Sequence, residues 1–293
     1  MPKAKAAHED AAVTIAGVTV THPDRLLWPS AGVSKRDLAD YCVAVADRLL
    51  PHVANRPLTL LRCPAGSEGK CFVQKHPWPG LSKAVRRIRD GDDEWLAVDD
   101  AAGLVALVQM GVLEFHPWGA TVDDLEHPDR VVFDFDPAPD RDEGVPWARV
   151  VEGAKAIRSL LDGMGLRSVV KSTGGKGLHV VVPIEPRAGW EAVKAFAHEV
   201  AERLAASAPE RYTTNPLKEA RRGRVFLDHL RNSRGATAVA AFSPRARAGA
   251  PIAVPLDWEA LNDDPAAIQR VLSDPPTDDP WPDLSRLRQR LPG

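Results

Sequence analysis

The stretch VVFDFDP, residues 131–137, constrains the fold of this chain more than any other part of the sequence. Alternate residues of a β-strand point to the same side, so Phe133 and Phe135 face one way while Asp134 and Asp136 face the other. Pro137 lacks the N–H group that would continue a strand ladder. The pattern predicts a strand that packs its apolar side on a core and carries two carboxylates to its end.

The two side chains leave the strand roughly 6–7 Å apart, because a strand rises about 3.3 Å per residue. Unpaired, they would repel each other and be costly to desolvate, whereas divalent ions would neutralise them. Oxygen ligands favour Mg²⁺ or Mn²⁺ over zinc, and pairs of such ions serve phosphoryl and nucleotidyl transfer. A third acid, Asp228, ends the apolar stretch GRVFLD at 223–228. The alternatives are a surface loop without metal and, for Asp228, a helix or turn cap.

Residues 169–184, VVKSTGGKGLHVVVPI, predict a strand, a glycine-rich turn and a second strand. The segment lacks the GxxxxGK[ST] pattern of a Walker loop and no helix is expected after it. Glycines allow backbone N–H groups to approach phosphate oxygens, and Ser172, Thr173, Lys176 and His179 can add contacts. The alternative is a tight hairpin turn with a structural histidine.

Composition narrows the class of protein. The longest apolar stretch, residues 101–113, is too short to span a bilayer. Cys42, Cys63 and Cys71 form no CxxC pair, so we expect neither a disulfide nor a cysteine zinc site. This cysteine usage favours a reducing cytosol. The net charge is −2, but residues 62–89 hold seven Lys/Arg and one Glu, and residues 211–247 hold nine Lys/Arg and two acids. This segregation indicates a basic face, although each run alone is equally consistent with a solvated surface.

Periodicity and cap signals predict alternating elements of both kinds. Ser34, with Asp37 three residues later, is expected to start a helix, and Asp99 or Asp100 to cap a second. Helices are predicted at 101–110, 146–162 and 190–206, and a hairpin at 13–20. Further strands are predicted at 57–63, 71–76, 94–98, 112–116, 168–171, 178–184, 224–228 and 237–242. We expect a tail at 1–10 and one α+β domain at 11–293, divisible into two lobes, with a wrapping C-terminal segment from about 257.

An ordered set of motifs then points to a family. The chain contains HPDRLLWP, GVSKRDLADY, FVQKH, EFHPW, VFDFDP, STGGKGLHVVVP, VFLDHLRN and FSPRARAGAP, in that order. Over about residues 13–258 this set closely resembles the polymerase domain of bacterial ligase D, in the archaeo-eukaryotic primase superfamily. The resemblance implies a primase-type α+β core with mixed or antiparallel sheets flanked by helices, here as a stand-alone protein or as one domain of a longer one.

The resemblance also implies roles for individual residues. Asp134, Asp136 and Asp228 would hold two divalent ions, Mn²⁺ or Mg²⁺, with His116 beside them. The contacts to the incoming triphosphate would come from Thr173, in the place of the family's serine, and from Lys176, His179, Arg231, Arg245 and Arg247, with Ser172 beside them. DNA would be contacted by Arg25 and Lys35 at a 5′-phosphate, by Phe72 as a stacking aromatic, and by Lys75. The family often has a second aromatic after Phe72, where this chain has Val73.

The implied function is templated nucleotidyl transfer, filling gaps and extending ends with a preference for ribonucleotides, in DNA double-strand break repair. The implied partners are gapped or broken duplex DNA, nucleoside triphosphates, Ku and a separate DNA ligase, with no membrane. The implied location is the bacterial cytoplasm, at the nucleoid. Two alternatives stay open: a phosphatase of the haloacid dehalogenase class, which also uses DxD after an apolar strand, and a nucleic-acid-binding protein without activity.

Overall fold

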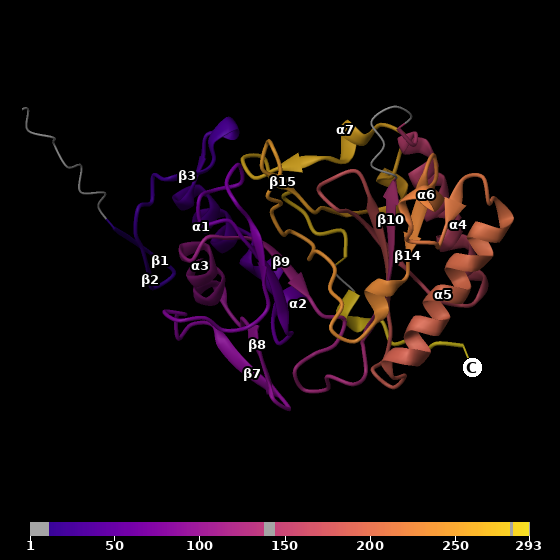
Figure 1. Cartoon of the computed structure of the whole chain (residues 1–293), viewed down its shortest axis with the longest axis horizontal. Helices are drawn as coiled ribbons and strands as arrows, with labels where there is room; N and C mark the ends of the chain where they lie inside the picture. Colours follow the sequence, from indigo (N-terminus) through magenta and orange to yellow (C-terminus); the bar gives the residue numbers. More distant parts are fainter. Residues whose placement is uncertain (1–11, 138–143, 282–283, 293) are drawn as a thin grey trace, which may run out of the picture.

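The first half of the chain builds a five-stranded sheet with helices beside it (Figure 1). The computed structural model describes residues 12–137, 144–281 and 284–292. Strands β6, β5, β8 and β7 follow one another in the sheet, and β9 pairs with β5. The elements of this half are β1 (Val13–Ile15), β2 (Val18–Val20), β3 (Leu26–Trp28), η1 (Pro29–Ala31), β4 (Val33–Ser34), α1 (Lys35–Ala44), α2 (Ala46–Val53), β5 (Leu58–Arg62), β6 (Phe72–Gln74), β7 (Arg86–Asp90), β8 (Asp93–Ala97), α3 (Ala101–Gln109) and β9 (Val112–Pro117).

The second half builds a six-stranded mixed sheet in the order β13-β14-β10-β12-β11-β16. Only β13 and β14 run parallel, and the other neighbours are antiparallel. The elements are β10 (Arg130–Pro137), α4 (Trp147–Gly163), β11 (Val169–Ser172), β12 (Leu178–Pro183), α5 (Trp190–Ser207), β13 (Tyr212–Thr213), α6 (Lys218–Arg221), β14 (Val225–Asp228), η2 (Leu230–Asn232), β15 (Pro251–Ile252), β16 (Pro255–Leu256), η3 (Trp258–Ala260), α7 (Pro265–Ile268), β17 (Arg270–Val271) and η4 (Leu284–Arg286).

Local signals explain most of these boundaries. Ser34 and Asp37 form the predicted capping box at the start of α1, and Asp100 accepts a hydrogen bond from Gly103 at the start of α3. Together these caps satisfy N–H groups that a helix cannot satisfy internally. The observed elements and sheets confirm the predicted α+β class and the predicted strand that carries Asp134 and Asp136, which is β10.

The apolar side of β10 packs on α4 and α5, which lie together at one side of Figure 1. Phe133 and Phe135 are buried there. Gly153 of α4 permits the close approach, because a Cβ atom at this position would meet the Tyr212 ring at 2.7 Å and the Phe135 ring at 3.1 Å. The carboxylate side of β10 consequently faces away from the two helices.

One predicted strand is absent. Residues 237–242 form no strand, and only Thr237 makes a single bridge, to Trp118. Phe242 has a φ of 62°, so the backbone turns where a strand would continue. The helix predicted to start at Ser34 ends at Ala44, and a second helix, α2, begins at Ala46.

The expected absence of a disulfide is also wrong, because Cys63 and Cys71 are bonded to each other. Strands β5 and β6 are antiparallel, with Arg62 opposite Phe72. One step further along this register places the two cysteines opposite each other across the loop 64–70. Cys42 is free and buried.

The C-terminal segment packs against the rest of the chain. Trp281 is buried, and its indole ring lies edge-on to His52 of α2. Gln289 donates hydrogen bonds to the carbonyls of Arg167 and Pro183. The predicted tail at 1–10 lies outside the described residues. Within the described part of the chain, no helix combines the length and apolar character needed to cross a membrane.

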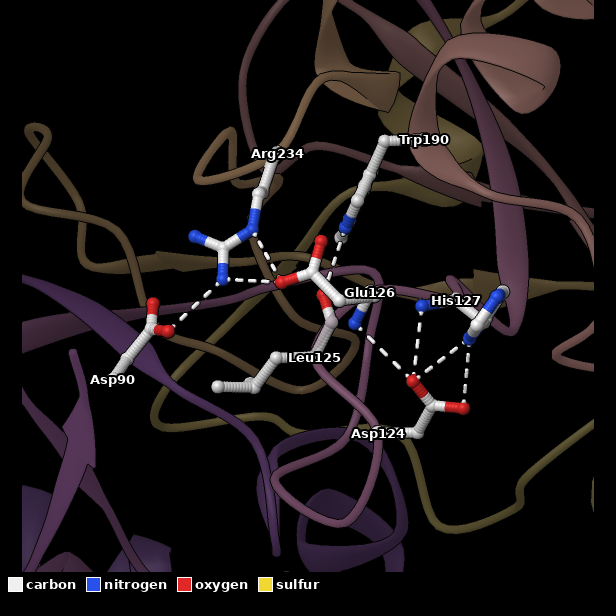
Figure 2. A network of polar contacts seen from close by, with 7 residues as sticks. All are labelled: Asp90, Asp124, Leu125, Glu126, His127, Trp190 and Arg234. Atoms are coloured by element: carbon white, nitrogen blue, oxygen red, sulfur yellow. Dashed lines mark hydrogen bonds and ion pairs between the residues drawn. The ribbon is translucent and has the colours of Figure 1, made fainter.

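Figure 2 shows a polar network that joins segments of both halves. Arg234, in the loop after η2, binds Glu126 at 2.6 Å and Asp90 of β7 at 3.0 Å. The Trp190 indole, at the start of α5, donates to the Leu125 carbonyl at 2.8 Å. The network holds the loop that leads into residues 237–239.

Candidate active site

A row of four polar side chains crosses the six-stranded sheet. Asp134 of β10 lies opposite Asp228 of β14 on one side and opposite His179 of β12 on the other. Lys171 of β11 lies opposite His179. Directly opposed residues in neighbouring strands share a face of the sheet, so the four side chains form one line on the face away from α4 and α5.

Arginines compensate the carboxylates of this row. The Arg231 Nε atom lies 3.0 Å from an oxygen of Asp134 and 3.1 Å from an oxygen of Asp228. His179 Nε2 lies 3.4 Å from the other oxygen of Asp134, and Arg221 binds Asp136 at 2.6 Å. Each predicted acid therefore has a cationic or imidazole partner.

The pKa values of the two opposed acids move in different directions. Burial would raise the pKa of Asp134, but His179 and Arg231 outweigh it and hold that pKa well below its usual range. Burial raises the pKa of Asp228, and Arg231 opposes it only in part. Burial, reinforced by the charge of Lys171, lowers the pKa of His179 to about 4, so its imidazole is neutral at pH 7.

The donor set fits a hard divalent cation. Asp134 and Asp228 already share one cationic group between their oxygens, and both are carboxylates, which Mg²⁺ and Mn²⁺ prefer. Asp136 is turned to Arg221 in this arrangement. Consistent with that, no group of three or more His, Cys, Asp or Glu side chains among the described residues is close enough to hold a metal ion.

A pocket of about 370 Å³ opens beside these acids. Its size is in the range of ligand-binding pockets. It brings together most of the predicted nucleotide-binding residues with two of the acids. The predicted residues that line it are His116, Asp134, Asp136, Thr173, Lys176, His179, Arg231, Arg245 and Arg247.

The glycine turn forms one wall of this pocket, between β11 and β12 as predicted. The Thr173 hydroxyl donates to the Gly177 carbonyl at 3.1 Å. Ser172 does not line the pocket, because its buried hydroxyl accepts a hydrogen bond from the Val254 backbone N–H. The predicted role of Ser172 as a phosphate contact is therefore not supported, and its hydroxyl instead holds a neighbouring segment.

His116 contacts a carboxylate that sequence analysis had not singled out. Its Nε2 atom lies 2.8 Å from Glu114 Oε2, and the same oxygen lies 2.9 Å from Nε of Arg245. Glu114 is buried. Its signal in the sequence is its place two residues before His116, which puts both side chains on one face of β9.

Lys171 and Arg221 are the other site residues that sequence analysis missed. Lys171 belongs to the row of four, is buried, and its Nζ atom has no hydrogen-bond partner among the described residues. Burial lowers its pKa to about 7. The alternation of the strand 169–172 could have shown that Lys171 shares a face with Thr173, but no local pattern shows that Arg221 reaches Asp136.

The predicted DNA contacts lie on the first half of the chain. Lys35 is buried and donates to the Thr21 carbonyl at 2.8 Å, while Arg25 is exposed. Burial lowers the pKa of Lys35, and the nearby charge of Arg25 lowers it further, so two cations face each other as they would around an anion. Phe72 is 39% exposed, with the Arg62 guanidinium 5.4 Å from its ring centre, and Lys75 is exposed beyond β6.

The sheet topology contradicts the phosphatase alternative. A haloacid dehalogenase fold is doubly wound, with its DxD strand among parallel neighbours. Here β10 is antiparallel to both β12 and β14.

Comparisons with known proteins identify the family. Residues 34–277 match the family model described as LigD, primase-polymerase domain. The chain is 42% identical, over 94% of its length, to the multifunctional non-homologous end joining protein LigD of Pseudomonas aeruginosa. It is 31% identical, over 82% of its length, to the bifunctional protein LigD of Bacillus subtilis. The chain spans 34% and 39% of these two relatives.

A solved structure shows the same fold. The polymerase domain of Mycobacterium tuberculosis ligase D, determined in complex with DNA, superposes with a TM-score of 0.79 and 32% sequence identity. The match covers 87% of this chain and 92% of that one. The chain therefore belongs to the LigD primase-polymerase domain family.

Proposed function

We propose that this chain adds nucleotides to the 3′ end of a primer strand at gaps and breaks in duplex DNA. The observation that carries this proposal is the pocket in which Asp134 and Asp136 lie beside Lys176, Arg245 and Arg247. A pocket lined by both carboxylates and cations matches a nucleoside triphosphate, which needs metal ions at its reacting phosphate and positive charge along its tail.

The chain's own residues bind and orient the substrate in this account. Lys176, Arg245 and Arg247 neutralise the triphosphate, and the glycine turn brings backbone N–H groups close to its oxygens. The primer 3′-oxygen bonds to the α-phosphorus, the bond to the β-phosphate oxygen breaks, and pyrophosphate leaves.

The metal site is proposed at Asp134, Asp136 and Asp228. Two divalent ions, Mn²⁺ or Mg²⁺, would when bound supply the charge that activates the attacking hydroxyl and stabilises the leaving oxygens. In the structure Arg231 pairs with Asp134 and Asp228, and Arg221 pairs with Asp136.

The DNA partner is proposed to lie along the first half of the chain. Arg25 and Lys35 would hold the 5′-phosphate on the far side of a gap, Phe72 would stack on a base, and Lys75 would contact the backbone. The ribonucleotide preference, the location at the nucleoid and the partnership with Ku and a ligase remain part of this proposal.

Primer extension on a gapped duplex tests the proposal. Ribo- and deoxyribonucleoside triphosphates are supplied separately, each with Mn²⁺ or with Mg²⁺, and extension is expected with at least one metal and to be faster with ribonucleotides. DNA binding without extension under any of these conditions would instead support a nucleic-acid-binding protein that lacks activity.

A further inference from the structure

Glu114 is a buried carboxylate that joins two segments around the pocket, its own strand β9 and residues 245–246. It is 4% exposed and lies on β9, in the first half of the chain. Its Oε2 atom accepts from His116 Nε2 at 2.8 Å and from Arg245 Nε at 2.9 Å, and Oε1 accepts from the Ala246 backbone N–H at 2.8 Å. A buried carboxylate with three donors is a fixed anchor, because releasing any donor would leave charge uncompensated.

The contact with Glu114 determines which nitrogen of His116 carries the proton. Burial would raise the pKa of Glu114, but its partners lower it to about 2, so the carboxylate can only accept a hydrogen bond. Burial lowers the pKa of His116, which makes the imidazole neutral at pH 7. A neutral imidazole has one N–H group. Because Glu114 can only accept, this group lies at Nε2 and donates to Glu114, which leaves Nδ1 as an acceptor.

The second nitrogen, Nδ1, is not used by the contact with Glu114. The His116 side chain lines the pocket with Asp134 and Thr173, and it is 22% exposed. No described residue donates a hydrogen bond to Nδ1. An acceptor on the pocket wall recognises a hydroxyl group and offers nothing to a bare C–H, which is the difference between a sugar and its deoxy form.

The same carboxylate fixes the phosphate end of the pocket. Arg245 donates hydrogen bonds from Nε to Glu114 and from Nη1 to the Thr173 carbonyl. Its guanidinium plane is therefore held between β9 and the glycine turn. The bond to the Ala246 N–H fixes the backbone between Arg245 and Arg247, which both line the pocket.

We propose that Glu114 is a positioning residue that fixes His116 as a hydrogen-bond acceptor for a sugar hydroxyl of the incoming nucleotide and Arg245 as a donor to its phosphates. This rests on the proposed function, since it takes the pocket's ligand to be a nucleoside triphosphate. Because one carboxylate holds both His116 and Arg245, a change at Glu114 affects sugar recognition and phosphate binding together.

The test compares Glu114→Gln with Glu114→Asp, and uses Glu191→Gln on the exposed face of α5 as the matched control. Binding of ATP, 2′-deoxy-ATP and 3′-deoxy-ATP is measured without primer, and kcat/KM is measured on a gapped duplex. We expect Glu114→Gln to weaken ATP binding at least tenfold and to reduce discrimination against one of the two deoxy forms at least fivefold. Glu114→Asp, which keeps the charge, should recover part of both losses.

Two outcomes would overturn the role of Glu114. One is wild-type binding and discrimination in Glu114→Gln. The other is an equal loss in both variants that follows only a lower Tm, because that would mean that Glu114 matters for packing alone.

A measurement on the wild-type protein stands even if the variants do not fold. Nitrogen-15 NMR of the histidine rings, with the His116 signals assigned from His116→Ala, should show protonated Nε2 and unprotonated Nδ1 at neutral pH. The opposite tautomer, or a charged ring, would contradict the proposal. Because ATP binding and the tautomer need no turnover, a protein that passes both but extends no primer would refute the proposed function and leave the role of Glu114 intact.

Discussion

At the scale of single residues, Gly177 is the most tightly confined part of the glycine turn. A Cβ atom here would lie 2.5 Å from the backbone oxygen of Phe135, which cannot move without disturbing β10. Gly175 differs, since its added Cβ would meet only the flexible end of Arg247, at 3.1 Å.

These two glycines give a matched pair of variants. Gly177→Ala should lower the free energy of unfolding by about 1–3 kcal/mol, as overpacking does. Gly175→Ala should leave it nearly unchanged and affect only nucleotide binding through Arg247. Urea unfolding of both variants checks this, and equal stabilities would mean that the turn is looser than the structure shows.

Arg25 and Lys35 should differ although both are proposed to hold one phosphate. Arg25→Ala should weaken binding to a gap with a 5′-phosphate by about 1.5–3 kcal/mol, the strength of a charge-assisted hydrogen bond, and leave stability unchanged. Lys35→Ala should show the same loss and also a lower Tm, because the Lys35 ammonium binds the Thr21 carbonyl inside the fold.

Titrations with phosphorylated and unphosphorylated gaps separate the possibilities. Equal losses on both DNAs would indicate a general basic surface in place of a dedicated phosphate site.

At the scale of elements, the disulfide between Cys63 and Cys71 closes the loop between β5 and β6. Phe72 and Lys75 follow directly after it, and the loop also contacts β3, where the Ser67 N–H donates to the Leu27 carbonyl at 2.7 Å. A cross-link over eight residues restricts the unfolded chain, which is one account of how disulfides stabilise proteins.

Reduction should therefore lower the free energy of unfolding by about 2–3 kcal/mol. The variant Cys63→Ser/Cys71→Ser should have the stability of the reduced protein and no response to reductant. If the double variant and the oxidised wild type unfold at the same urea concentration, the disulfide does not contribute.

Sequence patterns predicted the elements whose signals are local. The capping box of Ser34, the alternation around Asp134 and the glycine turn each depend on neighbours within a few residues, and each is confirmed. The misjudged strand at 237–242 contains the β-formers Thr237, Val239 and Phe242, but its backbone is decided by the turn at Phe242.

The same limit applies to the site. The two opposed aspartates could be predicted as strand ends, but their pairing comes from a sheet register that joins residues 94 positions apart. Glu114, Arg221 and the cysteine pair were missed because their partners are set by tertiary contacts. Glu114 had a usable signal in its shared face with His116, as Lys171 had in its shared face with Thr173.

At the scale of the whole molecule, we propose that residues 11–293 fold as one unit of two lobes. One continuous apolar core contains residues from both sheets. His52 of α2 lies beside Phe242 and Trp281, its Nε2 atom has no hydrogen-bond partner among the described residues, and burial lowers its pKa to about 3.

His52 gives the fold a predictable response to acid. Below its ordinary pKa the unfolded chain binds a proton that the folded chain excludes, so stability falls as the pH drops from about 6.5 towards 3, by up to about 1.4 kcal/mol per pH unit. Replacing His52 with Phe should flatten this slope. Urea unfolding at pH 7, 6 and 5 measures it, and a second, pH-independent transition would indicate lobes that unfold separately.

The central claim, that the acids of the six-stranded sheet carry nucleotidyl transfer, is tested most directly by nucleotide addition with Asp134→Asn. The assay uses a gapped duplex with ribonucleotides and Mn²⁺, and Asp162→Asn on the exposed side of α4 is the control. The account predicts a fall in rate of more than about a hundredfold, beyond the loss expected for a residue that only orients a metal ligand, with the fold and the control activity unchanged. Extension by a folded Asp134→Asn protein at a rate near that of the wild type would contradict it.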